Sequence, residues 1–211
     1  INSKPLTIPW IAEHVPAIIE AWNPGLEGGT ALARILFGDD SPSGKLTLSF
    51  PYHVGQQPVY YNQVPGWHGR QKYVDMPQTP LFAFGHGMSY TDFAYADLTV
   101  AQDKLMPEQP LQVTVRVTNT GQRAGTEIVQ LYINDLYSSV TTPAQELKAF
   151  KRVELEPAET QTVSFEVPHD QLSLVNRDLE RAVEPGTFEV MVGGSSRKDD
   201  LLETTFHVAN K

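Results

Sequence analysis

Apolar and polar residues alternate with a period of two along much of the second half of the chain, the pattern of β-strands that bury one face. The longest run is Leu111–Thr118, in which every second residue is Leu or Val. Runs around 129–133 and 188–192 repeat the pattern, and turn residues such as Glu184-Pro185-Gly186 separate the runs. About seven short strands over residues 91–211 predict an all-β sandwich of the immunoglobulin-like type.

Residues 1–50 follow a different pattern, which predicts two short helices. A proline at the first turn favours a helix over Pro9–Val15, and Pro16 ends it because the residue before a proline avoids the helical conformation. Apolar residues at helical spacing predict a second helix over Glu27–Phe37, and Gly38 is a suitable stop.

Two apolar runs in the same region, Ala17–Trp22 and Leu46–Phe50, predict buried strands on either side of the second helix. Together they make a strand–helix–strand unit of about 50 residues, which is too small to close an α/β layer of its own. The chain also begins with Ile1 in place of Met. We therefore expect an α/β fragment of a longer or processed protein, followed by the all-β sandwich.

Residues 51–90, between these two regions, are rich in Pro, Gly and aromatic residues. A loop of this length is usually either functional or disordered. The aromatic side chains carry too much apolar surface to remain in water. We therefore expect an ordered connecting loop.

Composition excludes several classes of protein. The chain has 25 acidic and 16 basic residues and a net charge of −9, which argues against nucleic-acid binding, since phosphate contacts need clustered Lys and Arg. No stretch approaches the ~20 apolar residues of a membrane span. The chain has no Cys, and its six His show no metal-ligand spacing. We predict no cofactor, no metal, and neither a nucleic-acid nor a membrane partner; oligomeric state and cellular compartment stay open.

A series of segments carries a signal that is specific as a series, whereas each segment alone is weak. Ala21–Gly29 reads Ala-Trp-Asn-Pro-Gly-Leu-Glu-Gly-Gly, and Pro80–Thr91 contains Phe-Gly-His-Gly-Met-Ser-Tyr. They resemble segments of the family 3 glycoside hydrolases. Further segments that resemble this family are Asn2–Leu6, Leu36–Asp39, Pro42–Leu46, Gln57–Asn62, Val117–Gly121, Gly125–Glu127, Val129–Tyr132 and Glu146–Phe150. The order is kept from about residue 1 to residue 208, and the whole series is similar to the bacterial β-glucosidases of the family.

The resemblance implies a three-part plan: a barrel with the aspartate nucleophile, an α/β sandwich domain that lends the general acid/base, and a fibronectin type III-like domain. This chain then comprises the C-terminal part of the α/β sandwich domain (1–52), a connecting loop (53–90) and the fibronectin type III-like β-sandwich (91–211). The implied function is that of the C-terminal region of a retaining β-glucosidase-type hydrolase of O-glycosyl bonds. Its β-linked oligosaccharide or glycoside substrate is met through the barrel domain, which this chain lacks, so the isolated chain is predicted to be inactive.

The resemblance also supplies candidate site residues. Glu27 matches the Glu that acts as acid/base in plant exoglucanases of the family, whereas in most bacterial relatives a Glu on an upstream loop has this role. The alternative interpretation of Glu27 is a first-turn residue that stabilises the helix dipole. Asn2, Trp67, His68 and Arg70 are candidates for substrate binding, because amides bond sugar hydroxyls and aromatic rings stack on sugars. Trp67 equally suits packing within the long loop.

A second hypothesis is a free-standing β-sandwich module that binds carbohydrate or protein. The regular strands of residues 91–211 permit it. The incomplete α/β segment 1–50 argues against it, because a free module has no use for an unfinished sheet. The motifs do not specify which β-linked sugar is cleaved.

Overall fold

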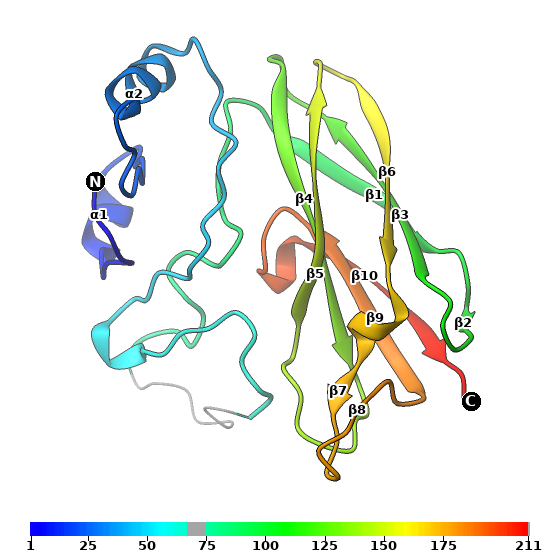
Figure 1. The fold of residues 1–211 in the computed structure, drawn as a ribbon. Helices are drawn as coiled ribbons and strands as arrows, with labels where there is room; N and C mark the ends of the chain where they lie inside the picture. The colour runs from blue at the N-terminus through cyan, green and yellow to red at the C-terminus, as the bar shows by residue number, and fades with distance from the viewer. Residues whose placement is uncertain (67–74, 211) are drawn as a thin grey trace.

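The computed structural model describes residues 1–66 and 75–210, and it shows a β-sandwich with a layer of short helices and irregular chain on one side (Figure 1). The strands, all of which follow residue 92, are β1 (Phe93–Val100), β2 (Lys104–Leu105), β3 (Leu111–Asn119), β4 (Gly125–Asp135), β5 (Glu146–Leu155), β6 (Thr160–Val167), β7 (Leu174–Val175), β8 (Arg181–Ala182), β9 (Gly186–Gly193) and β10 (Leu201–Val208). The described residues also form short 3-10 helices: η1 (Val54–Gln56), η2 (His169–Leu172) and η3 (Lys198–Asp200).

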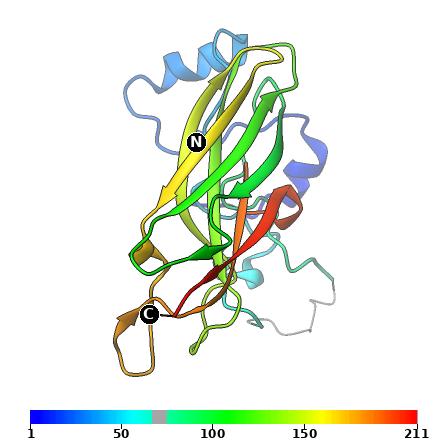
Figure 2. The same cartoon turned by 90° about the vertical axis from the view of Figure 1, so that its right-hand side faces the viewer.

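The sandwich consists of two packed sheets. One has the strand order β1-β3-β6, the other has the order β2-β10-β9-β4-β5, and β7 pairs with β8 in a separate hairpin. Neighbouring strands are antiparallel except β2, which pairs in parallel with β10. Figure 2 shows the helices behind the sandwich, so the helical layer covers one side only.

The core between the sheets follows directly from the period-two pattern. Leu111, Val113 and Val115 of β3 are fully buried, and every second residue of β4 from Val129 to Ile133 joins them in one cluster. Phenylalanines from three further strands complete the cluster: Phe165, Phe188 and Phe206. The predicted all-β sandwich is therefore confirmed.

Strand β4 is buried on both faces over its central part. Gln130 and Tyr132 point away from the core and are nevertheless buried, because the connecting segment covers them. Tyr61 lies edge-on to Tyr132, with ring centroids 5.9 Å apart, and stacks on Phe84 at 4.2 Å. The Gln130 amide donates to the carbonyl of Gly85 at 3.2 Å. The described part of the connecting segment thus packs on the outer face of the five-stranded sheet.

The connecting segment is also bonded to itself through one buried amide. Gln56 Nε2 donates to the carbonyls of residues 77, 78 and 79 at 3.0–3.1 Å, and its Oε1 accepts from the backbone N–H of Tyr52. Because a buried amide left without partners is costly, these bonds fix the ends of the segment relative to each other.

Two helices form in the N-terminal layer (residues 1–50), where the sequence predicts them: α1 (Pro9–His14) and α2 (Gly28–Phe37). Gly38 ends α2 in the left-handed conformation, with φ of 79°. The C-terminal end of α2 is anchored to residues that follow it in the chain: the Tyr90 hydroxyl donates to the Ile35 carbonyl at 2.7 Å, and Arg123 Nη2 donates to the Gly38 carbonyl at 2.9 Å. Within the described residues, no helix has the length and hydropathy needed to cross a membrane.

The two predicted strands in this layer are wrong. Residues 17–22 and 46–50 are irregular, and their only β-type pairing in the described residues is an isolated bridge between Phe50 and Phe82. Ile18 and Ile19 are exposed. Residues 46–50 exchange backbone hydrogen bonds with residues 81–86 only at Leu46 and Phe50, which is too few for a continuous ladder. Residues 17–22 have no strand beside them in the described chain.

A buried ion pair joins the N-terminal layer to the sandwich. Lys45 Nζ lies 3.1 Å from Glu127 Oε2, and the two side chains are only 14% and 5% exposed. The Tyr95 hydroxyl donates to Glu127 Oε1 at 2.7 Å, and Lys45 also donates to the carbonyl of Gly87 at 2.9 Å. Gly194 closes the site, since a Cβ there would lie 2.6 Å from Glu127 Oε1.

Candidate functional site

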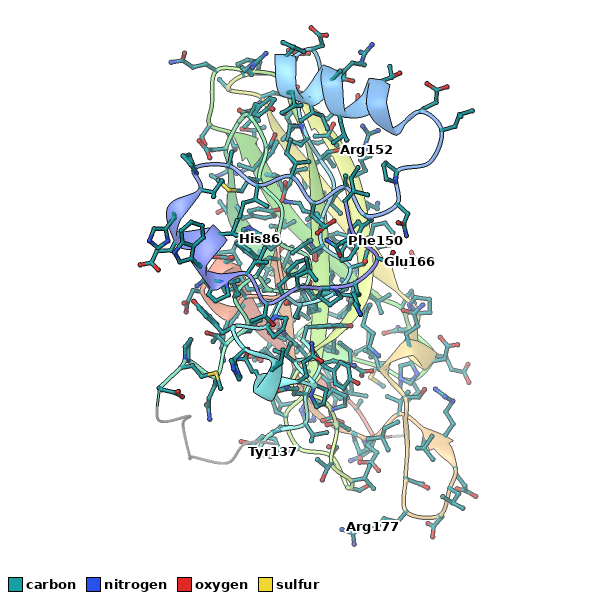
Figure 3. The ribbon with its side chains drawn as sticks, turned by 90° about the vertical axis from the view of Figure 1, so that its left-hand side faces the viewer. His86, Tyr137, Phe150, Arg152, Glu166 and Arg177 are labelled. Carbon is teal, nitrogen blue, oxygen red and sulfur yellow. The ribbon has the colours of Figure 1, made fainter. Side chains whose placement is uncertain are left out.

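A concavity lies between the N-terminal layer and the outer face of the five-stranded sheet (Figure 3). Its volume is about 1010 Å³. Apolar residues line the helical side, among them Ala12 of α1 and Ala31 and Ile35 of α2. Charged residues line the sheet side, among them Arg152 and Glu154 of β5. The cavity therefore has one largely apolar wall and one charged wall.

His86 is the titratable ring in the wall of this cavity. Its ring stacks on Phe82 with centroids 5.3 Å apart, and its carbonyl accepts from the backbone N–H of Leu46 at 2.8 Å. Burial, reinforced by the nearby Lys45 charge, lowers the pKa of His86 below its usual value. The ring is therefore neutral near pH 7 and can accept or donate one hydrogen bond at each nitrogen according to its tautomer.

Glu27 stands at the N-cap of α2, and its side chain is exposed and makes no capping hydrogen bond. It does not line the cavity. Because α2 is anchored to the rest of the molecule at its opposite end, Glu27 projects from the free end of the helix. Its role as acid/base stays a prediction.

Asn2 is held by the N-terminal layer itself. Its Nδ2 donates to Glu20 Oε2 at 2.5 Å, and its Oδ1 accepts from the backbone N–H of Lys4 at 2.9 Å. Glu20 Oε1 in turn accepts from the backbone N–H of Trp22 at 2.8 Å. No hydrogen bond in the described residues joins Asn2 to Glu27. The other predicted substrate contacts, Trp67, His68 and Arg70, lie outside the described residues.

Sequence reasoning missed Glu20 and His86. Glu20 is a cavity residue that interrupts the apolar run of residues 17–22, so its charge among apolar neighbours was a usable signal. His86 is flanked by Gly85 and Gly87, and a Cβ at either glycine would collide with neighbouring atoms. The two glycines therefore mark a site of close packing around the histidine.

The carboxylates of Asp40 and Glu154 in the cavity wall pair with arginines. Arg34 Nε and Nη2 donate to the two oxygens of Asp40 at 2.5 and 2.8 Å, and this hydrogen bond lowers the pKa of Asp40. Retaining glycoside hydrolysis needs two carboxyl groups ~5–5.5 Å apart, one of them a nucleophile.

In the part of the chain that the structure describes, no set of three or more His, Asp or Glu side chains is placed to hold a metal ion.

Comparison with protein families assigns both regions of the chain. Residues 1–90 match the glycosyl hydrolase family 3 C-terminal domain. Residues 127–196 match the fibronectin type III-like domain.

Comparison with individual proteins agrees along nearly the whole chain. A β-xylosidase of Formosa agariphila is 47% identical over 210 residues, which cover 99% of this chain and 29% of that protein. A periplasmic β-glucosidase of Salmonella typhimurium is 38% identical and is matched over 94% of this chain and 27% of its own length.

Solved structures give the same result. The β-glucosidase of Listeria innocua in complex with glucose superposes with a TM-score of 0.90 at 37% identity, covering 98% of this chain and 30% of that one. A β-glucosidase of Erythrobacter marinus superposes with a TM-score of 0.93 at 42% identity, covering 99% and 27%. The chain thus spans less than a third of the length of the relatives it matches. It belongs to glycoside hydrolase family 3 and corresponds to the C-terminal part of the β-glucosidases and β-xylosidases of that family.

Proposed function

We propose that this chain serves a retaining β-glucosidase-type hydrolase as its C-terminal region, in which it completes the wall of the active site and stabilises the rest of the enzyme. The aspartate that attacks the O-glycosyl bond then belongs to a barrel domain outside this chain. The substrate class is a β-linked oligosaccharide or glycoside, in keeping with the names of the relatives.

The observation that carries this proposal is the uneven distribution of exposed apolar side chains. Among the described residues, sixteen large apolar side chains are exposed in residues 1–90 and six in the rest of the chain. By contrast, Phe50 is the one large apolar side chain of the described part of 1–90 that is buried, next to the buried Pro51. The N-terminal layer is therefore built to be covered by more protein.

The helices show the same imbalance in detail. The only buried residue in α1 and α2 is Gly28, and Phe37 at the end of α2 is 85% exposed. Burying a side chain such as Leu36 or Phe37 stabilises a protein by about 1.5–3 kcal/mol. A free-standing module would forgo this contribution at each of these positions, which disfavours the alternative function.

Glu20, Glu127 and Glu27 are poorly suited to form a hydrolytic pair. Glu20 already accepts hydrogen bonds from Asn2 and Trp22, and Glu127 is occupied by Lys45 and Tyr95. Glu27 is exposed at a free helix end, where bulk water competes for any substrate. The isolated chain is accordingly expected to be inactive. Its contribution to hydrolysis is to complete the wall of the active site and to stabilise the rest of the enzyme.

A chimera tests the proposal. The segment of the Formosa agariphila β-xylosidase that aligns with this chain is replaced by the chain, and hydrolysis of nitrophenyl β-xyloside and nitrophenyl β-glucoside is measured. The expected result is hydrolysis by the chimera and none by a variant of the same enzyme that lacks the segment, because the chain should restore the missing cover.

The isolated chain is assayed in parallel, with its far-UV circular dichroism as the control for folding. Turnover of either nitrophenyl glycoside by the isolated chain would contradict the proposal. A chimera that is folded and soluble but as inactive as the deletion variant would contradict it as well.

A further inference from the structure

A second, polar pocket opens at the end of the sandwich remote from α2. The loop between β4 and β5 forms most of its wall, with Pro65 and Arg177 on the other sides, and its volume is about 600 Å³. Arg177 belongs to the turn between β7 and β8, which lies beside this loop at the lower end of the molecule in Figures 1 and 2. Arg177 Nε donates to the carbonyl of Ser139 at 3.2 Å, so the two loops are bonded to each other.

The loop is held rigidly in place. Both oxygens of Glu184 accept hydrogen bonds from Ser139, one from its backbone N–H at 2.8 Å and one from its hydroxyl at 2.5 Å. The Ser138 hydroxyl bonds the carbonyl of Val140 at 2.7 Å and lies 3.1 Å from the Thr142 hydroxyl. The pocket is therefore preformed, and a ligand would not have to order its wall.

Three groups of the pocket have unused binding capacity. Asp135 Oδ1 accepts from the backbone N–H of Tyr137 at 3.2 Å, but Asp135 Oδ2 is buried with no hydrogen-bond partner among the described residues. The terminal Nη atoms of Arg177 take no part in the hydrogen bonds and ion pairs of the described residues. Tyr137, which lines the same pocket, is 78% exposed.

These groups define the chemistry of a ligand. Asp135 lines the pocket, and its Oδ1, which accepts one hydrogen bond, can accept a second from a ligand hydroxyl, as carboxylate oxygens do. The buried Oδ2 has almost no accessible surface, so a ligand reaches it only if the loop moves. Hydroxyls can donate to Asp135 and accept from Arg177, whereas an anion is repelled by the carboxylate and a cation by the guanidinium. An exposed aromatic ring beside such groups offers an apolar face to a sugar ring. The threonine and serine hydroxyls of the loop add further polar contacts.

We propose that this pocket binds a neutral oligosaccharide, with Tyr137 as the stacking platform and Asp135 and Arg177 as the hydrogen-bonding pair. The pocket takes no part in cleaving the glycoside and instead holds a length of glycan on the sandwich. The choice of β-linked glycans as ligands rests on the function proposed above, whereas the pocket itself is argued from its own side chains.

The test is a titration of the isotopically labelled 211-residue chain with cellotetraose and with xylotetraose, followed by NMR. Saturating shifts are expected at the amides of residues 136–142 and at the Arg177 Nε–H, with a Kd in the millimolar range. Tyr137→Ala and Asp135→Asn are each expected to weaken binding about tenfold, the loss that one good contact represents. Tyr60→Ala removes another exposed tyrosine, which lies outside the pocket, and should leave the Kd unchanged.

The absence of saturating shifts with both glycans would overturn the proposal, and a trapped water would then account for the buried Asp135 oxygen. Shifts confined to other residues, or equal Kd values for wild type and Tyr137→Ala, would overturn it too. Dispersed amide spectra confirm that each variant is folded, and Arg177→Gln provides a second surface variant with the same expectation. The titration measures binding without hydrolysis, so it can fail while the chimera succeeds, and the reverse.

Discussion

The buried ion pair between Lys45 and Glu127 should decide whether the N-terminal layer stays attached to the sandwich. Lys45→Met leaves the Glu127 carboxylate buried, with the Tyr95 hydroxyl as its remaining partner, and removes a donor from the Gly87 carbonyl. At 3.1 Å the attraction is about 5 kcal/mol for an effective dielectric constant near 20. Burying the two charges also costs desolvation free energy, which offsets part of this attraction. Removing one partner of a buried ion pair lowers the folding stability of proteins by about 3–5 kcal/mol, and this is the loss expected here.

The location of the tryptophans makes the effect measurable. All three lie within residues 1–67, so tryptophan fluorescence reports on the N-terminal part, whereas far-UV circular dichroism reports mainly on the sandwich. In urea, Lys45→Met should lower the midpoint of the fluorescence transition by about 1.5–2.5 M for an m-value near 2 kcal/mol/M. The circular dichroism transition should move much less, because the sandwich core stays intact.

Two control variants sharpen the result. Arg116→Met breaks an exposed ion pair with Asp97, which is expected to contribute less than about 1 kcal/mol. Lys45→Met combined with Glu127→Gln removes the unpaired charge and keeps an acceptor for Tyr95, so it should recover much of the loss. The reasoning is refuted if Lys45→Met moves the fluorescence midpoint no further than Arg116→Met does.

Two further outcomes follow from the packing around residue 86. Gly85→Ala places a Cβ against Gln130 at a residue with φ of 79°, so it should lower the melting temperature. The left-handed conformation alone should cost about 1–2 kcal/mol of folding stability. Gly44→Ala, at an open position, is the control, and an equal loss of stability there would contradict this account. The pKa of His86 is lowered in the folded chain, so the unfolded chain binds more protons below about pH 6.5, and stability should fall as the pH drops through that value. His86→Gln should abolish that part of the slope in melting temperatures recorded from about pH 5 to 8, and an unchanged slope would argue against His86 as its source.

The sandwich was predictable because its signal is local. In β3, β6 and β9 the apolar residues of the core cluster stand at every second position, and one buried face suffices to fix a strand in a sheet. The end of α2 was predictable for the same reason, since Gly38 is the residue that tolerates the left-handed cap. The runs at 17–22 and 46–50 have equally apolar sequences, yet whether they pair depends on strands elsewhere, which no local pattern reveals.

The candidate sites were less predictable, because they depend on contacts between distant residues. Glu127 has the same parity in β4 as the core residues Val129 and Leu131, so a charge at an inward position indicated a buried partner. Nothing in the sequence indicates that the partner is Lys45. The polar pocket likewise brings Asp135 beside Arg177 only because the β7–β8 hairpin folds back over the β4–β5 loop.

The two-sided burial of β4 has a consequence for how such proteins can be cut and recombined. The sandwich begins at residue 93 by its strands, but the outer face of its central strand is sealed by Tyr61, Phe84 and Gly85. An excision at residue 91 would leave Tyr132 and the Gln130 amide open to solvent. The segment that can be exchanged between relatives is therefore longer than the strand pattern implies. A recombinant that receives this sandwich must also receive the residues from about 58 onward, or must already have a segment that covers the outer face of β4 in the same way.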